Sequence, residues 1–221
     1  MSAAIRARDG LRELSGERIG NEMRRLVLAP RAAETAAAMQ EAGILPIVLA
    51  GIGYLAAFAR LEAFEAAAGI RPDLAVRLAA LACRIPEDAL RITELLRLSN
   101  AERDRIVAVL AVRRDMTTLP DTRTARRLAY VHGNAFAGGA RLAFAAGTGA
   151  HEAGWQALQS LAAPPRFPLS GKDIIESSRI SRGPEVGVLL RSLEAWWIDQ
   201  DFTPDEAALR QRLQQIVAAT Q

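Results

Sequence analysis

The sequence predicts an all-α fold, an irregular bundle of short helices, and three observations support this. Apolar residues recur at the three- and four-residue spacing of helices in several segments. Residues that cap helix N-termini stand just before these segments. We find no convincing alternating segment of strand length and no Asn-Gly hairpin. At 221 residues, half of them hydrophobic, the chain can form one large or two small helical domains.

The first strong helix signal begins at Ser15, a favoured N-cap residue. The apolar positions that follow form one stripe, made by Ile19, Met23, Leu26 and Val27. Pro30 ends this helix or starts the next, and the alanine-rich run after it stops at Gly43.

An apolar run covers residues 42–59 and approaches the lower length limit of a membrane span. Three glycines and Pro46 interrupt it, and Arg60 closes it. We therefore expect a buried turn between two core helices and no membrane partner.

Later helices carry clear start signals. Pro72 and Asp73 open one helix. Ser99 to Glu102 and Thr203 to Glu206 both match the capping box, in which the two side chains satisfy each other's backbone N–H groups. Three tryptophans lie on leucine stripes, so we expect core packing from Trp155, Trp196 and Trp197. The proline-rich segment 163–168 disfavours a helix and predicts a domain boundary nearby.

The charge balance is mildly basic, with a formal net charge of +3 and a pI of about 9.7. Lys172 is the only lysine, so almost all of the positive charge is arginine. A GC-rich genome explains this preference more simply than selection for bidentate phosphate contacts, although such contacts are what guanidinium groups make best. The single cysteine, Cys83, lies in an apolar context that indicates a buried structural thiol.

Two segments resemble class II CCA-adding tRNA nucleotidyltransferases of the bacterial, poly(A)-polymerase-like type. The first contains Ser15, Glu17, Arg18 and Glu22, and is similar to the Ser-x-Glu-Arg-Ile-x-x-Glu motif of that family's neck helices. The second runs from Phe167 to Asp173 and continues with Gly183-Pro184-Glu185-Val186-Gly187, similar to the family's C-terminal Gly-x-Asp and Gly-Pro-x-x-Gly pair.

The resemblance implies neck helices over residues 1–42, an RNA-binding helical body over 43–163 and a C-terminal tail over 164–221. It also implies cytoplasmic tRNA 3′-end maturation, with tRNA rather than DNA as partner and Mg²⁺, CTP and ATP used by a full-length member. The family's catalytic head precedes the neck motif, which begins here at Ser15. We therefore expect no catalytic residue in this chain, no activity from it alone, and a separate catalytic head as a further partner.

Three short charged segments match catalytic motifs of the family but stand downstream of Ser15 and in the wrong mutual order. They are Asp199-Gln200-Asp201, Arg113-Arg114-Asp115 and Glu87-Asp88-Ala89-Leu90-Arg91. We assign them to chance, because a motif without its structural context carries little weight. His132 and His151 have no further ligands at suitable spacing, so we expect no metal site.

The remaining candidates are sites for RNA phosphates. Arg123, Arg126 and Arg127 share one predicted helix, where a solvated face and a phosphate-binding ridge both explain them. Gly171 and Lys172, with the predicted helix start at Gly183, suit an anion-binding site or a simple tight turn equally well.

In the neck, Arg18 and Glu22 can pair at four-residue spacing. Ile5, Leu11 and Leu14 are expected to expose apolar surface and to weaken the N-terminus. The alternative function is a helical scaffold derived from this family that has lost RNA binding.

Overall fold

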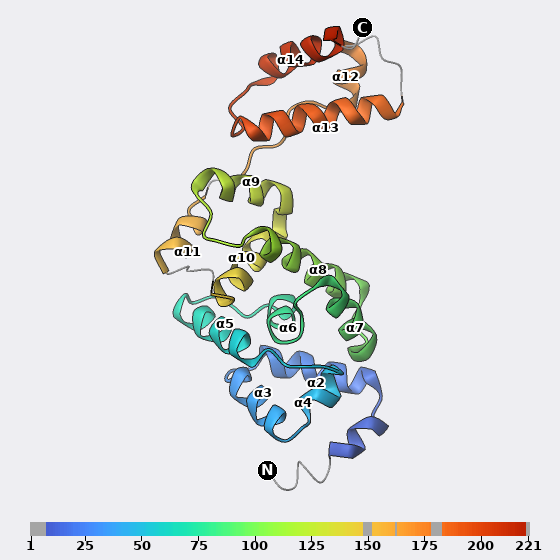
Figure 1. Ribbon diagram of the computed structural model, residues 1–221, viewed down its shortest axis with the longest axis vertical. Helices are drawn as coiled ribbons and strands as arrows, with labels where there is room; N and C mark the ends of the chain where they lie inside the picture. The colour runs from blue at the N-terminus through green and yellow to red at the C-terminus, as the bar shows by residue number, and fades with distance from the viewer. Residues whose placement is uncertain (1–7, 148–151, 162, 178–182, 220–221) are drawn as a thin grey trace. The chain divides into compact units, whose positions relative to one another are not determined.

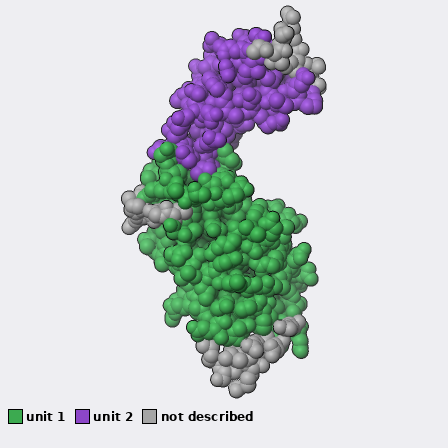
Figure 2. All heavy atoms as spheres, viewed as in Figure 1, with its two compact units in different colours: residues 1–121, 131–160 green, residues 122–130, 161–221 purple. Residues whose placement is uncertain are grey.

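The computed structural model of the protein describes residues 8–147, 152–161, 163–177 and 183–219. Within these ranges the chain forms helices and no β-strand, which confirms the all-α prediction (Figure 1). The chain divides into two compact units, shown in Figure 2. Unit 1 comprises residues 1–121 and 131–160, and unit 2 comprises residues 122–130 and 161–221. The division into neck, body and tail rests on the family resemblance and not on contacts between residues, so it stays a prediction.

Unit 1 surrounds one central helix. Its elements are η1 (Arg8–Glu13), α2 (Gly16–Leu28), α3 (Ala32–Glu41), α4 (Leu45–Leu49), α5 (Leu55–Ala67), α6 (Leu74–Ala82), α7 (Pro86–Leu96), α8 (Asn100–Asp115), η2 (Gly133–Ala135), α10 (Phe136–Ala145) and α11 (Glu152–Gln159). Every residue of α6 from Ala75 to Ala82 is buried, because helices α2, α5, α7, α8 and α10 all contact it. Apart from Arg77, this helix is apolar on all sides, and such a helix is stable only when it is buried.

Three predicted helix starts in unit 1 are confirmed, and at each of them a side chain caps the helix through a local hydrogen bond. The Ser15 hydroxyl accepts a hydrogen bond from the Arg18 amide at 3.3 Å at the start of α2. Ser99 and Glu102 form the predicted capping box at the start of α8. Asp73 caps α6 through the Val76 amide.

The apolar run 42–59 is a turn between core helices, as predicted. Gly43 has a φ of 72°, in the left-handed region that suits glycine, and the short helix α4 follows before α5 begins at Leu55. Leu45, Leu49 and Phe58 are fully buried in the core of unit 1. None of the described helices is long and apolar enough to cross a membrane.

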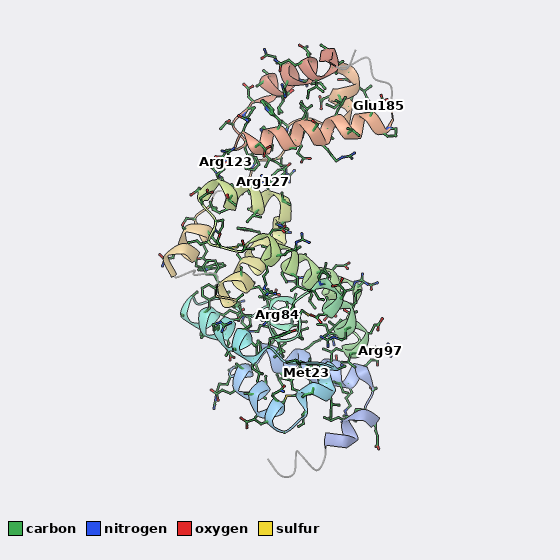
Figure 3. All side chains as sticks on the ribbon, viewed as in Figure 1. Met23, Arg84, Arg97, Arg123, Arg127 and Glu185 are labelled. Atoms are coloured by element: carbon green, nitrogen blue, oxygen red, sulfur yellow. The ribbon has the colours of Figure 1, made fainter. Side chains whose placement is uncertain are left out.

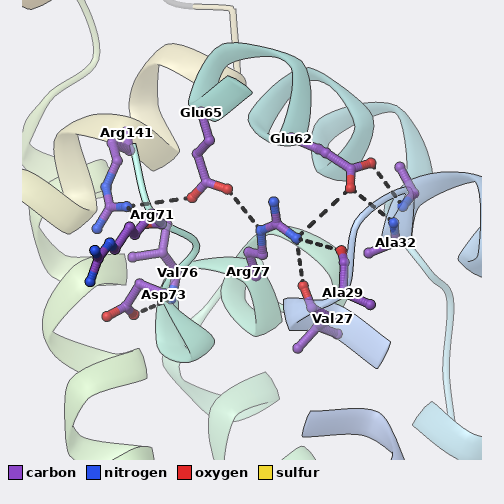
Figure 4. A network of polar contacts seen from close by, with 11 residues as sticks. Val27, Ala29, Ala32, Glu62, Glu65, Arg71, Asp73, Val76, Arg77 and Arg141 are labelled. Atoms are coloured by element: carbon purple, nitrogen blue, oxygen red, sulfur yellow. Dashed lines mark hydrogen bonds and ion pairs between the residues drawn. The ribbon is translucent and has the colours of Figure 1, made fainter. Parts of the chain in front are cut away.

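A buried polar network ties α2 and α3 to the centre of unit 1 (Figure 4). The Arg77 guanidinium, on α6, donates to the Val27 carbonyl at 2.7 Å and to the Ala29 carbonyl at 3.3 Å, at the C-terminal end of α2. It also donates to Glu65 at 2.7 Å. On the neighbouring turn of α5, Glu62 accepts hydrogen bonds from the Ala32 and Ala33 amides, at the start of α3. The network therefore satisfies backbone groups at both ends of the α2–α3 connection.

Unit 2 contains α9 (Thr122–His132) up to Tyr130, α12 (Gly171–Ser177), α13 (Pro184–Asp199) and α14 (Glu206–Ala219). Its core gathers around Trp197, which makes edge-on ring contacts with Tyr130, Phe167 and Phe202. Trp155, in unit 1, is likewise packed against Phe64 and Phe144. The predicted core role of these two tryptophans is confirmed.

The predicted capping box from Thr203 to Glu206 is wrong. Helix α14 begins at Glu206, and the Asp205 carboxylate caps it by accepting the Ala208 amide at 2.9 Å. Thr203 instead donates its hydroxyl to the Gln200 carbonyl, within the turn after α13. The Trp197 indole donates to the Pro204 carbonyl at 2.9 Å, which keeps this residue in the turn and delays the helix.

Candidate nucleic-acid interface

The neck motif occupies the first half of α2. Ser15 has a structural role as the N-cap, whereas Glu17, Arg18 and Glu22 are exposed on the helix surface. Glu22 pairs with Arg25 at 3.2 Å and not with Arg18. Both of these side chains are largely exposed, so the pair contributes only a few tenths of a kcal/mol or so.

A groove of about 460 Å³ lies beside this motif, with charged side chains at its rim and apolar ones on its floor. Its lining residues are Leu11, Leu14, Arg18, Ile19, Glu22, Met23, Arg25, Leu26, Ala29, Thr35, Met39, Ile44 and Val48. Leu14 is 39% exposed, so this predicted apolar residue does present surface at the groove. Ile5, of the same predicted patch, lies outside the described residues.

Two contacts hold α2 against the helices behind it. Arg24 donates to both carboxylate oxygens of Glu102 on α8, at 2.8 and 2.9 Å. Mainly through the Arg24 hydrogen bond, helped by the Ser99 hydrogen bonds, the pKa of Glu102 is lowered to about 2. Gly20 lies so close to α7 that a Cβ atom there would be 1.9 Å from the Leu96 carbonyl oxygen. The motif helix is therefore fixed by charge and by a close backbone approach.

The arginines of α9 meet the C-terminal end of α13 within unit 2, where Figure 3 labels Arg123 and Arg127. Arg123 donates to the Asp199 carbonyl, and Arg126 pairs with the Asp201 carboxylate. Arg127 lies 3.5 Å from the Asp199 carboxylate and keeps 62% of its side chain exposed. The acidic neighbours therefore lower the positive potential at this face of α9. Arg127 has the longest ion-pair contact and a largely exposed side chain.

The same contacts decide how the Asp199-Gln200-Asp201 segment should be interpreted. Each carboxylate already faces an arginine, and the segment begins at the last residue of helix α13. Across the described residues, no group of three His, Cys, Asp or Glu side chains is placed to hold a metal ion. The pair does not fit a two-metal nucleotidyl-transfer site, which needs carboxylates free to bind both ions.

The other two charged segments also have structural partners. Asp88 accepts the Arg84 and Ile85 amides at the start of α7 and pairs with Arg91 at 3.0 Å. Asp115 lies 2.9 Å from Arg114 and 3.0 Å from His132. His151, the other histidine, lies outside the described residues.

In the tail, an acidic side chain occupies the helix start beside Gly171 and Lys172. Asp173 accepts the Ser170 hydroxyl at 2.6 Å and its amide at 2.8 Å. With the Ser170 hydroxyl as the largest cause, the pKa of Asp173 is lowered to about 2. Lys172 is exposed and 3.6 Å from Glu176. A phosphate approaching this helix start would meet the Asp173 carboxylate.

Gly183 stands just before α13, whose first residue is Pro184, as predicted. No side chain caps this helix start. The structure thus leaves the first backbone N–H groups of α13 without a side-chain acceptor.

A further group of basic residues was missed in the sequence. Arg84 stacks on the Tyr54 ring at 3.7 Å from its centroid, and Arg113 donates to the Arg84 carbonyl at 3.5 Å. Arg60 belongs to the same group, because its charge, like that of Arg113, lowers the pKa of Arg84. These residues come from three separate segments, namely α5 with its N-cap Tyr54, the α6–α7 connection and α8, so no spacing in the sequence marks the whole group.

Residues 1–55 match the family model described as "Probable RNA and SrmB-binding site of polymerase A". A comparison with curated proteins finds no match. The matched segment includes η1 to α4 and ends at Leu55, so it contains the neck motif and the groove. The first 55 residues are therefore similar to the RNA-binding site of poly(A)-polymerase-like proteins, which supports RNA as a partner.

Proposed function

We propose that this chain is an RNA-binding helical part of a poly(A)-polymerase-like nucleotidyltransferase, and that the RNA it holds is a tRNA whose 3′ end is matured in the cytoplasm. The observation that carries the proposal is the match of residues 1–55 to an RNA-binding site. The motif at Ser15, Glu17, Arg18 and Glu22 and the pair of tail motifs support the finer assignment to CCA addition by their resemblance alone.

RNA would be bound through its phosphates and its shape. Arginine forks in helical surfaces contact phosphate oxygens without reading bases, which suits a protein that must accept many tRNAs of one shape. On α9, a phosphate would replace the Asp199 carboxylate at Arg127, since the existing contact is long and exposed. We assign nucleotidyl transfer, with Mg²⁺, CTP and ATP, to a catalytic head that the described helices would serve.

The test is the binding of fluorescently labelled tRNA lacking its CCA end, followed by anisotropy over a salt series. We expect the logarithm of the affinity to fall linearly with the logarithm of the salt concentration. An unlabelled A-rich single strand of equal length should compete poorly. Equal competition by that strand would favour a poly(A)-type substrate over tRNA, and no binding at low salt would overturn RNA binding itself.

Arg127→Gln tests the part played by α9. The salt slope should fall by about 1, the expected loss for one phosphate contact. Arg191→Gln removes an exposed arginine from α13 in the same unit and is the matched control. Equal slopes for the two variants and the wild-type protein would remove α9 from the interface.

The second candidate function is a scaffold that binds protein rather than RNA. The groove beside α2 favours it, because its floor is apolar and the matched family model names a protein, SrmB, besides RNA. The same salt series separates the two functions, since a scaffold predicts no salt-dependent tRNA binding.

A further inference from the structure

Unit 1 carries a basic cluster that has no ion pair with a described acidic residue. Arg84 lies over the Tyr54 ring, Arg113 reaches the Arg84 carbonyl, and the charges of Arg113 and Arg60 both act on Arg84. Arg60 comes from α5, Arg84 from the connection between α6 and α7, and Arg113 from the last turn of α8. Tyr54 is fixed by its amide, which donates to the Leu81 carbonyl at 2.7 Å. Figure 3 labels Arg84 on unit 1.

Backbone carbonyls, not carboxylates, hold the three guanidinium groups. Arg60 donates to the Ala145 carbonyl at 2.6 Å, Arg84 to the Cys83 carbonyl at 3.3 Å, and Arg113 to the Arg84 carbonyl at 3.5 Å. None of the three takes part in an ion pair with a described acidic residue. Because each guanidinium has five N–H donors, most of the donors in this cluster remain for a ligand.

Asp88, whose charge acts on Arg84, does not neutralise the cluster. Asp88 is already engaged by the Arg84 and Ile85 amides and by Arg91. Burial, followed by the charge of Arg113 and then that of Arg60, lowers the pKa of Arg84, with Tyr54 and Asp88 opposing. Like charges held together in a partly buried place repel one another, and an anion between them would relieve this repulsion.

This arrangement differs from that of α9. The arginines there face Asp199 and Asp201, which already supply negative charge. In the unit 1 cluster the guanidinium carbon of Arg84 lies 3.7 Å from the centroid of the Tyr54 ring, a cation–π contact that holds the arginine fork in place before a ligand arrives. A fixed fork with uncompensated charge is suited to a phosphodiester group.

We propose that Arg60, Arg84 and Arg113, oriented by Tyr54, form a binding site for the phosphate backbone of RNA in unit 1. The inference rests on the proposed RNA-binding function and adds a site that is independent of α9. Tyr54 lies within the segment similar to an RNA-binding site, whereas the three arginines follow that segment in the sequence. The site contacts phosphates only, so it adds affinity and salt dependence without selecting bases.

The experiment measures binding of labelled tRNA lacking its CCA end to Arg84→Gln, Arg113→Gln and the double variant over a salt series. Each single variant should weaken binding about fivefold at low salt and reduce the salt slope by about 1. The double variant should reduce the slope by about 2. Arg114→Gln is the matched control, because Arg114 is the next residue of α8, is exposed and is paired with Asp115.

A second measurement does not depend on substitution. Phenylglyoxal modifies accessible arginines, and bound tRNA should protect Arg60, Arg84 and Arg113 in a peptide mass map while leaving Arg114 reactive. If wild-type protein binds tRNA but neither Arg84→Gln nor Arg113→Gln differs from Arg114→Gln, and protection is absent, the site is refuted while RNA binding stands. If wild-type protein binds no tRNA at low salt, the proposed function itself fails.

Discussion

Arg77 and Glu65 form an ion pair in the interior of unit 1, with 2.7 Å between Arg77 Nε and Glu65 Oε2 and exposed side-chain fractions of only 6% and 1%. Burial raises the pKa of Glu65, and the Arg77 hydrogen bond opposes that rise. Arg77 also donates to the Val27 carbonyl and thereby fixes the C-terminal end of α2. The segment similar to an RNA-binding site is thus anchored by a residue that lies outside it.

Arg77→Met should destabilise the protein by about 3 kcal/mol or more, because it leaves the buried Glu65 without its main partner and two carbonyls of the α2 terminus without a donor. Urea unfolding followed by circular dichroism measures this. Arg105→Met removes an arginine whose side chain is 66% exposed from its pair with Asp73, and it should cost about 1 kcal/mol or less. Equal losses in the two variants would contradict the anchoring role.

Glu102 should make stability depend on pH. Its pKa is lowered from 4.5 to about 2 in the folded protein, so the unfolded chain binds the proton more readily. The stabilisation is present above the unfolded value and is lost as the pH falls from about 5 towards 2. Glu102→Gln should be less stable than wild type near about pH 7, and the difference should shrink near about pH 3. A difference that stays constant between these two pH values would refute this assignment.

Gly20→Ala should destabilise unit 1 by about 2 kcal/mol, because its Cβ would lie 1.9 Å from the Leu96 carbonyl oxygen and α2 would have to move away from α7. Gly187→Ala is the matched helical control. Its nearest neighbour is the flexible end of Arg191 at 3.4 Å, so the change should be neutral or stabilising by about 0.5–1 kcal/mol. Thermal unfolding of both variants makes the comparison.

Asp199→Asn should strengthen tRNA binding by about twofold to threefold at low salt. The Asp199 carboxylate faces Arg127 and weakens the attraction of Arg127 for a phosphate. The substitution removes this carboxylate. It leaves the Asp199 carbonyl, the acceptor for Arg123, in place. Anisotropy against Asp205→Asn, an exposed acid in the same unit, tests this. Weaker binding by Asp199→Asn would show that the pair organises α9 instead of competing with RNA.

Cys83 should be unreactive in the folded protein. The thiol is fully buried, and burial raises its pKa to about 12, so the thiolate is scarcely populated at neutral pH. Its reaction with Ellman's reagent should require unfolding and should follow the urea transition of unit 1. Rapid labelling without denaturant would contradict the buried position.

The sequence by itself determined the features that depend on neighbours three or four residues apart. The starts of α2 at Ser15 and of α8 at Ser99 could be predicted because the capping side chain and its amide lie within one helical turn. The all-α class and the core positions of Trp155 and Trp197 followed from the same helical period. The match of residues 1–55 agrees with the neck motif in its relation to poly(A)-polymerase-like proteins.

Only the tertiary structure decided which charges meet. Arg126 and Asp201 are 75 residues apart, and Arg84 stacks on a ring that precedes it by two helices, so neither contact has a signature in local spacing. Helix α14 starts at Glu206, where Asp205 caps it, and the Trp197 indole, seven residues before Pro204, donates to the Pro204 carbonyl. The electrostatic potential at a surface arginine depends on which charged groups lie near it, and folding brings those groups together from separate segments of the chain.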